Sequence, residues 1–151
     1  MILNDLLTKQ TVFSKIVLQD GNKELPKELK VKVMRIRMAY AKVKKVFDEE
    51  IQEFTKELIT DEFQQLAVKT DRTESEQARY KELVNKFNSE YQEFINQKGL
   101  EEVVEIDDSF TMEEYSDILD VNSGIEVELN GNKIPTVDFM EIVLDLFVSE
   151  K

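Results

Sequence analysis

The feature that most constrains this chain is a long stretch between Pro26 and Ile59 with apolar residues at heptad spacing. The intervals are three or four, apart from one double gap where Glu50 replaces an apolar residue. The apolar positions are Leu29, Val33, Ile36, Tyr40, Val43, Phe47, Phe54 and Leu58, with Ile51 beside the seam. This period is typical of a helix that lies along a partner helix. We therefore predict one long helix, which Pro26 can begin because its missing N–H is not needed there.

A second long helix is predicted to begin at the capping box formed by Thr73 and Glu76 and to end at Gly99, with Leu100 completing a Schellman cap. Its apolar positions again follow a heptad period: Tyr80, Leu83 or Val84, Phe87, Tyr91, and Phe94 or Ile95. The link of residues 61–72 is short, and we expect it to hold a brief extended piece. Two long helices with a short link favour an antiparallel helical hairpin.

Shorter elements are expected on both sides of this hairpin. Residues 2–18 are predicted to form a helix, which ends at a turn formed by Asp20-Gly21. Residues 101–106 are predicted to form a strand. Residues 125–129 alternate between apolar and acidic side chains, as in a strand, and the following Asn130-Gly131 is a strong signal for a β-hairpin turn. A capping box at Thr111–Glu114 opens a short helix through Leu119, and Thr136 caps a last helix over residues 137–148.

The expected fold class is therefore α+β and mainly α, a long antiparallel helical hairpin with a small acidic C-terminal segment of short strands and helices. We expect two parts: residues 1–99, with the first helix and the hairpin, and residues 100–151, an acidic α+β segment packed at the hairpin base. No internal repeat is predicted.

Charge is unevenly distributed along the chain, whose net charge is -12. Residues 1–60 carry 12 basic and 9 acidic side chains, whereas residues 99–151 carry 2 and 15. Within the long helix the basic residues come first and the acidic ones last, which opposes the helix dipole. An antiparallel partner helix with the opposite gradient would compensate. The acidic third is either a solvated surface or one that meets a basic partner, and we expect no direct nucleic-acid contact there.

Most catalytic chemistry is excluded by composition. The chain has no His and no Cys, and its four glycines are scattered, so it lacks Ser–His and Cys–His pairs, ordinary zinc sites and a phosphate loop. Asp120-x-Asn122-x-Gly124 resembles only the start of a calcium loop. The chain has no run of about 18 apolar residues, which a membrane-spanning helix would require. We therefore expect no enzyme activity, no cofactor, no metal and no membrane contact.

The long helix begins with the basic stretch Lys30-Val-Lys-Val-Met-Arg-Ile-Arg37, and the second long helix is followed by the acidic segment Glu101-Glu-Val-Val-Glu-Ile-Asp107. With these two stretches, the layout resembles small, uncharacterised helical-hairpin proteins of tailed bacteriophages. The resemblance covers most of the chain as a pattern rather than as a motif. That class has no settled activity and no catalytic residues to carry over, and it implies a virion component or an accessory factor, in the virion or the cytoplasm of the infected host cell.

We expect a non-catalytic structural or interaction protein that forms a homo-oligomer, acidic third against basic helix, and docks on other virion proteins. The alternative is a small acidic inhibitor, of the anti-defence or DNA-mimic type, of a host nucleic-acid-binding protein. The candidate protein-interaction residues are Lys30, Lys32, Arg35, Arg37, Glu101, Glu102, Glu105, Asp107 and Asp108.

Overall fold

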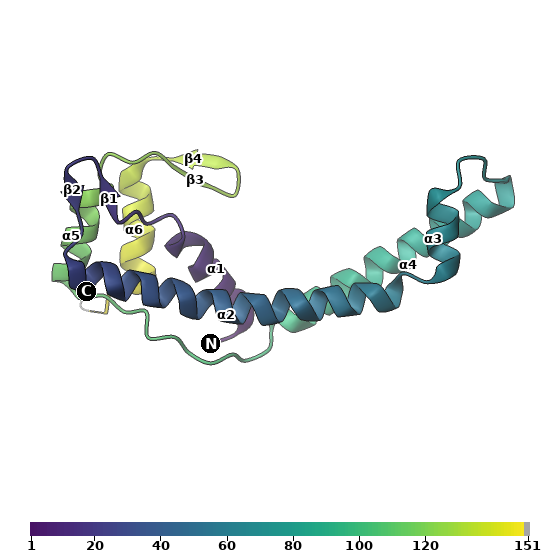
Figure 1. Cartoon of the computed structure of the whole chain (residues 1–151), viewed down its shortest axis with the longest axis horizontal. Coiled ribbons are helices and arrows are strands. Elements are labelled where there is room, and N and C mark those ends of the chain that lie inside the picture. Colours follow the sequence, from purple (N-terminus) through teal and green to yellow (C-terminus); the bar gives the residue numbers. More distant parts are fainter. Residues whose placement is uncertain (150–151) are drawn as a thin grey trace. The chain divides into compact units, whose positions relative to one another are not determined.

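The computed structural model describes residues 1–149, and most of them are helical (Figure 1). The elements are α1 (Leu3–Phe13), β1 (Gln19–Asp20), β2 (Lys23–Glu24), α2 (Lys27–Leu58), α3 (Asp61–Val68), α4 (Glu74–Gly99), α5 (Met112–Asn122), β3 (Val127–Leu129), β4 (Asn132–Ile134) and α6 (Thr136–Phe147). The strands form two separate antiparallel hairpins. The predicted fold class, mainly helical α+β with packing between α2 and α4, is confirmed.

The chain folds as two compact units. The core unit comprises Met1–Val43 and the residues from Val103 onward, and the arm comprises Lys44–Glu102. Helix α2 contributes residues to both units. This division differs from the boundary predicted at residue 99, because the first part of α2 belongs with the C-terminal third and not with α4.

Aromatic rings from distant parts of the sequence meet in the core unit. The Phe13 ring stacks on Phe110 at 5.9 Å between centroids and meets the edges of Phe147 at 5.3 Å and Tyr40 at 5.6 Å. The α2 residues Leu29, Val33, Ile36 and Tyr40 are buried in the same cluster. The heptad spacing predicted that these four residues pack against the second long helix. That prediction is wrong for this part of α2, whose apolar residues pack in the core unit. Full burial of each large apolar side chain is worth roughly 1.5–3 kcal/mol.

The core unit contains an internal repeat that was not predicted from the sequence. A helix, a β-hairpin, a proline and a second helix occur first as α1-β1-β2-α2 and again as α5-β3-β4-α6. The segments from Ser14 to Pro26 and from Ser123 to Pro135 are equal in length, and each carries a Gly-Asn-Lys turn. Gly21 has a φ of 60°, and Asn130 and Gly131 have φ of 53° and 80°. These left-handed conformations permit tight hairpin turns.

The two copies of the repeat pack reciprocally (Figure 1). Helix α5 contacts the first hairpin, and α1 contacts α6 of the second copy. At the end of α5 the buried Asn122 amide binds the first copy directly. Its Oδ1 accepts from the Val17 N–H at 2.9 Å, and its Nδ2 donates to the carbonyls of Val17 at 3.2 Å and Ile118 at 2.8 Å. Each copy therefore completes the core of the other.

Several predicted boundaries in the core unit differ from the structure. Helix α1 ends at Phe13 rather than residue 18, because the chain turns into the first hairpin. The capping box at Thr111 is confirmed, but α5 continues to Asn122. Thr136 does not cap α6, since its hydroxyl donates to the Ile125 carbonyl at 2.7 Å and Pro135 occupies the N-cap position.

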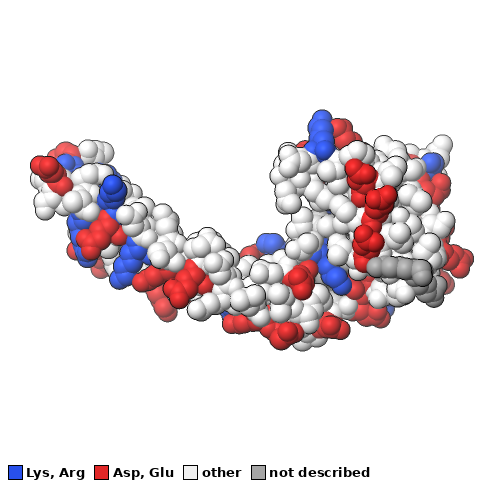
Figure 2. Space-filling view, turned by 180° about the vertical axis from the view of Figure 1, so that it is seen from behind, with Lys and Arg blue, Asp and Glu red and all other residues white. Residues whose placement is uncertain are grey.

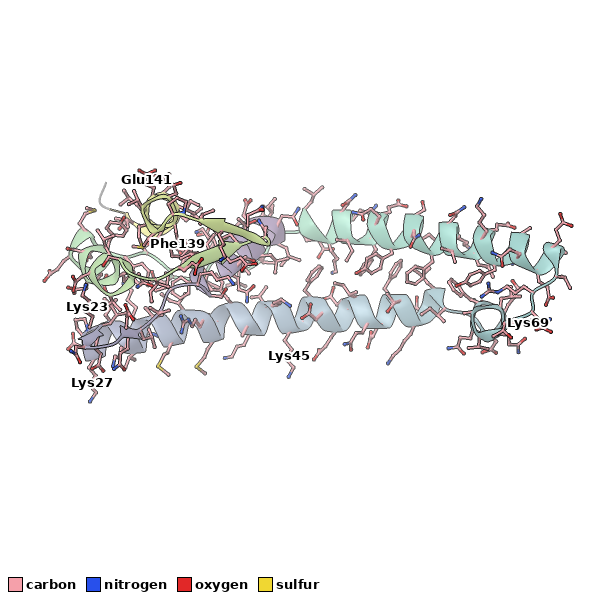
Figure 3. The ribbon with its side chains drawn as sticks, turned by 90° about the horizontal axis from the view of Figure 1, so that it is seen from above. Lys23, Lys27, Lys45, Lys69, Phe139 and Glu141 are labelled. Atoms are coloured by element: carbon pink, nitrogen blue, oxygen red, sulfur yellow. The ribbon has the colours of Figure 1, made fainter. Side chains whose placement is uncertain are left out.

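The arm is a thin layer of helices. The Phe54 ring stacks on Phe94 at 4.1 Å, and Lys98 pairs with Glu50, so the second part of α2 packs on α4 as predicted. Figure 3 shows side-chain rings between these two helices. The buried residues of the arm are Leu66, Leu83 and Gly99. The remaining apolar seam is only half-buried, in contrast to the core unit.

Residues 61–68 of the arm form helix α3 and not the extended piece that was predicted. The Thr60 hydroxyl accepts from the Phe63 N–H at 3.2 Å, and two acids follow in the first turn. The capping box at Thr73 is confirmed. The predicted Schellman cap is wrong, because Gly99 stays in the helix without a positive φ and Leu100 is 66% exposed. No helix within residues 1–149 is long and apolar enough to cross a bilayer.

Candidate protein-interaction site

An irregular segment of residues 103–109, here called the strap, occupies the place of the strand predicted for residues 101–106. One end is held by the Val103 N–H, which donates to the Met1 carbonyl at 2.9 Å. The other end is held by the Phe110 N–H, which donates to the Phe147 carbonyl at 2.7 Å. Between these anchors the backbone of residues 104–109 makes no hydrogen bond to any residue that the structure describes. The predicted strand is absent because the core unit offers it no neighbouring strand.

A groove of about 590 Å³ separates the strap from α2. Its apolar lining comes from Ile36, Met38, Ala39 and Val43 on α2 and from Val104 and Ile106 on the strap. Val104 is 81% exposed. Charged residues line the two walls, with Lys32, Arg35 and Lys42 on α2 and Glu105 and Asp107 on the strap. The groove is therefore apolar at its floor, basic on one wall and acidic on the other.

The predicted basic residues divide into engaged and open side chains. Lys30 pairs with Glu24, and Lys32 pairs with Glu114 at 2.9 Å. The Arg37 guanidinium donates to the Ile16 carbonyl. Burial lowers the pKa of Arg37, and its Nε has no hydrogen-bond partner within residues 1–149. Arg35 differs, because it is exposed and forms no ion pair with the described part of the chain.

Glu114 forms an ion pair with Lys32, and the pKa of its carboxyl group is lowered. Burial alone would raise the pKa of its carboxyl group. The Thr111 N–H and the Lys32 ammonium both donate to this carboxylate, and together they keep its pKa below the ordinary value. Lys32 also lies over the Phe110 ring at 5.1 Å. Lys32 therefore ties α2 to α5 and is less available to a partner than Arg35.

The predicted acidic residues divide in the same way. Glu101 and Glu102 belong to the arm, where Glu101 pairs with Lys98 at 3.0 Å. Glu105 lies 3.6 Å from the N-terminal ammonium, and Asp107 is exposed at the groove. Asp108 was expected at the surface but is 5% exposed. It is buried because it accepts hydrogen bonds from the Tyr40 hydroxyl and from Lys9 at 3.3 Å.

Four of the predicted residues therefore meet at one groove: Lys32, Arg35, Glu105 and Asp107. The apolar lining of the groove was missed, because Ala39 and Val104 lie off every predicted seam. Charge patterning alone identified the walls, and only the fold could place them opposite each other.

A second, more polar pocket of about 780 Å³ lies on the other side of the strap. Asp5, Thr8 and Lys9 of α1 line it together with strap residues. The Lys9 ammonium is occupied by Asp108 and lies 5.8 Å from the Phe147 ring centroid. No group of three potential metal-ligating side chains gathers among residues 1–149. The pocket thus offers polar contacts but no arranged metal site.

The outer surface of α2 carries exposed apolar and basic residues on one helical face, here called the basic face. Val31, Met34 and Met38 are 53%, 52% and 63% exposed. Lys27, Arg35 and Lys42 lie on the same face by helical spacing and are exposed. None of these three cations pairs with a residue in the described range. An apolar stripe of this kind, bordered by unpaired cations, is typical of an interaction surface.

The outer surface of α6 has the opposite character and is here called the acidic face. Asp138, Glu141 and Asp145 share one side of the helix with Val137, which is 68% exposed. Neither α5 nor α6 contains a Lys or Arg. Figure 2 shows acidic side chains in a row on this part of the molecule. The core unit therefore presents two surfaces of opposite charge, each with exposed apolar residues.

The chain matches no protein-family model, no curated protein and no solved structure. The reading of its function therefore depends on these surfaces and on the sequence layout.

Proposed function

We propose that this protein is a non-catalytic interaction protein that assembles head-to-tail, with the acidic face of one copy against the basic face of the next. The observation that carries this proposal is the placement of the two faces. Lys27 on α2 and Glu141 on α6 project from opposite sides of the core unit (Figure 3). A contact between different surfaces of identical chains is heterologous, and it closes into a ring or continues as a filament.

The two faces are complementary in chemistry. Lys27, Arg35 and Lys42 provide cations for the carboxylates of the acidic face, and Met34 and Met38 provide adaptable apolar contact for Val137. Single exposed ion pairs are worth about 0–1 kcal/mol, so several must act together with apolar burial. The association is therefore expected to weaken as salt rises. A larger partner that binds several copies would strengthen it by multivalency.

The sequence layout supports a more specific role as a bacteriophage virion component that docks on larger virion proteins. Copies arranged as a ring or filament present repeated surfaces to such proteins. Mass spectrometry of purified particles from the source tests this role directly. Its detection in stoichiometric amounts supports a virion component, and its absence from particles contradicts that role.

Sedimentation velocity of the full-length protein tests the head-to-tail contact. One variant makes both faces acidic, with Lys27→Glu and Arg35→Glu, and the other makes both basic, with Asp138→Lys and Glu141→Lys. Each variant should be monomeric alone, and an equimolar mixture should assemble again. The wild type should assemble at low salt and dissociate when the ionic strength reaches about 0.5 M.

A methionine pair supplies the matched control for the apolar part of the contact. Met34→Glu should abolish assembly, whereas Met112→Glu, at an exposed methionine on neither face, should leave it unchanged. A wild-type protein that stays monomeric at high concentration and low salt would contradict the proposal. Assembly that survives in both charge variants alone would equally contradict the assignment of the two faces.

The second candidate is an acidic inhibitor of a host nucleic-acid-binding protein. The absence of basic residues from α5 and α6 favours it, because such a surface can cover a basic groove. Capture from host lysate separates the two functions. A nuclease as the main partner, displaced by DNA and lost in the Glu141→Lys variant, indicates inhibition, and virion proteins indicate assembly.

A further inference from the structure

We propose that the groove between α2 and the strap binds an extended acidic peptide segment of a partner protein, which pairs its backbone with the strap. This site shares Arg35, Met38 and Lys42 with the basic face and adds the flank of α2 at Ile36, Ala39 and Val43 and residues 104–107 of the strap. Met34, on the basic face, does not line the groove, and a substitution there tells the two contacts apart. The partner is recognised by its chemistry: an extended chain with apolar and carboxylate side chains in alternation.

The strap is irregular, but like the edge of a sheet it carries backbone groups without a partner in the described residues. Residues 104–109 offer N–H and C=O groups that no residue in the described range satisfies. Buried or half-buried backbone groups are almost always paired in folded proteins, and here only solvent or a partner can pair them. Addition of a strand to a free edge is a recurring mode of peptide recognition, in which main-chain hydrogen bonds give the affinity.

The groove has the size and lining that such a segment needs. Residues 104–109 in an extended conformation span about 20 Å, which matches a peptide of about six residues. Alternate side chains of an extended peptide point to the same side. One set would enter the apolar floor at Ile36, Ala39 and Val43, in a groove of about 590 Å³.

Charge complementarity selects an acidic peptide. Arg35 and Lys42 line the α2 wall and have no ion pair among residues 1–149. Lys32 is held by Glu114, so it adds positive potential without being the main contact. On the opposite wall Glu105 lies 3.6 Å from the N-terminal ammonium, which leaves the exposed Asp107 as one acid against the two open cations of α2. The open cations thus face the peptide from α2, and charge-assisted hydrogen bonds to carboxylates are stronger than neutral ones.

The strap is already held in place before any partner arrives. Its first residue is anchored to Met1, and Asp108 near its end accepts from Tyr40 and Lys9. A segment fixed at both ends loses little conformational entropy on binding. The groove is therefore a preformed site rather than one that must be assembled.

The probe for this site is a blocked hexapeptide of alternating valine and glutamate, titrated into the isotopically labelled full-length protein. The amides of residues 104–108 should shift on binding and exchange more slowly with solvent. A valine–lysine hexapeptide should bind at least about tenfold more weakly. Two N-methylated hexapeptides separate strand pairing from side-chain contact. Each is methylated on alternate amides, so that one of its two backbone edges can no longer donate hydrogen bonds. Only the peptide methylated on the edge that faces the strap should lose binding.

Variants locate the peptide. Arg35→Glu and Ala39→Glu should each weaken binding by about tenfold or more, since one reverses the basic wall and the other fills the floor. Thr8→Glu alters the polar pocket across the strap and should have no effect. Met34→Glu should abolish self-assembly without changing peptide binding, so failure of the two proposals can be told apart.

The proposal is overturned if neither hexapeptide binds at about 1 mM, which corresponds to roughly 4 kcal/mol. It is also overturned if the lysine peptide binds equally, or if both N-methylated peptides retain full affinity. Shifts confined to residues 5–9 would place the peptide in the other pocket and reject this site.

Discussion

The hydroxyl of Tyr40, in the middle of α2, donates a hydrogen bond to the carboxylate of Asp108 on the strap. Both residues are buried, and Lys9 of α1 adds an ion pair to the same carboxylate at 3.3 Å. Three segments that lie far apart in the sequence are thus joined at one acidic group. A buried carboxylate is tolerated only when its oxygens are satisfied, so this network holds the end of the strap in place.

Removal of the Tyr40 hydroxyl should therefore destabilise the core unit. Tyr40→Phe leaves the buried Asp108 carboxylate with one partner fewer, and we expect a loss of about 1–3 kcal/mol in the free energy of unfolding. Urea unfolding followed by circular dichroism measures it. Tyr115→Phe is the matched control, because its hydroxyl donates to the Met140 carbonyl at 2.9 Å. This neutral bond should be worth only about 0.5–1.5 kcal/mol, and equal losses would contradict the role of Asp108.

The same network predicts loss of stability at alkaline pH. Burial, together with the hydrogen bond to Asp108, raises the pKa of Tyr40 above its ordinary value of 10.0. The folded protein then holds the phenol proton more tightly than the unfolded chain. Tyr40 therefore contributes stability that is complete below about pH 10 and is lost as pH rises beyond it.

Urea unfolding between about pH 9 and about pH 11 checks this dependence. The wild type should lose stability across the range, and Tyr40→Phe should lose less, because it has one fewer phenol to titrate. Identical pH profiles for the two proteins would show that Tyr40 does not carry the effect.

Asp108 also illustrates what the sequence could not reveal about the candidate site. A run of acids from Glu101 to Asp108 reads as a solvated surface, and the partners that bury one of them lie 68 and 99 residues away. Charge patterning selected Arg35 and Asp107 as candidate interaction residues, and both are exposed, although nothing in the sequence places them on opposite walls of a groove. Their function there stays a proposal.

The fold was predictable wherever the signal is local. The periodicity of α2, the capping boxes at Thr73 and Thr111 and the Asn130-Gly131 turn all fix structure within a few residues. The strand predicted for residues 101–106 failed, because a strand requires a partner and pairing is a long-range property. Helix α3 was missed although Thr60 and two following acids are a local start signal.

The repeated hairpins give a test with an internal control. Gly21 and Gly131 have positive φ, and a Cβ at either position would meet nothing within 4 Å. Alanine there should cost about 1–2 kcal/mol through backbone strain alone. Gly124→Ala should be neutral or slightly stabilising, since its added Cβ would lie in ordinary contact, 3.6 Å from Asp20 Oδ2. Thermal unfolding of the three variants measures the differences, and equal effects at all three glycines would contradict this reading of the turns.

The start of α4 should be sensitive to acid. The Lys69 ammonium at 2.6 Å and the Thr73 N–H at 3.0 Å hold the pKa of Glu76 down to about 2, below its ordinary 4.5. A lowered pKa in the folded state means that the contribution of Glu76 is present above about pH 4.5 and is lost as pH falls through about 2.

Carbon-detected NMR titration of the Glu76 carboxyl group checks this directly. Lys69→Met should raise the measured pKa toward the ordinary value, because it removes the largest cause of the shift. Glu76→Gln keeps a hydrogen-bonding side chain in the capping box and should make the first turn of α4 less sensitive to acid. A Glu76 pKa near 4.5 in the wild type would contradict the network.

The arm should open before the core unit does. Its seam is half-buried and few of its residues are buried, so its local unfolding requires less free energy than global unfolding. Phe94→Ala removes the ring that stacks on Phe54 at 4.1 Å, and we expect it to destabilise the arm by about 2–3 kcal/mol. Hydrogen exchange followed by mass spectrometry should show faster exchange in residues 61–99, with protection of α1, α5 and α6 unchanged.

Phe139→Ala, at a fully buried ring of the core unit, should instead accelerate exchange in α1, α5 and α6. If Phe94→Ala accelerates exchange equally everywhere, the arm and the core unit unfold as one cooperative unit and the division into two units has no energetic meaning.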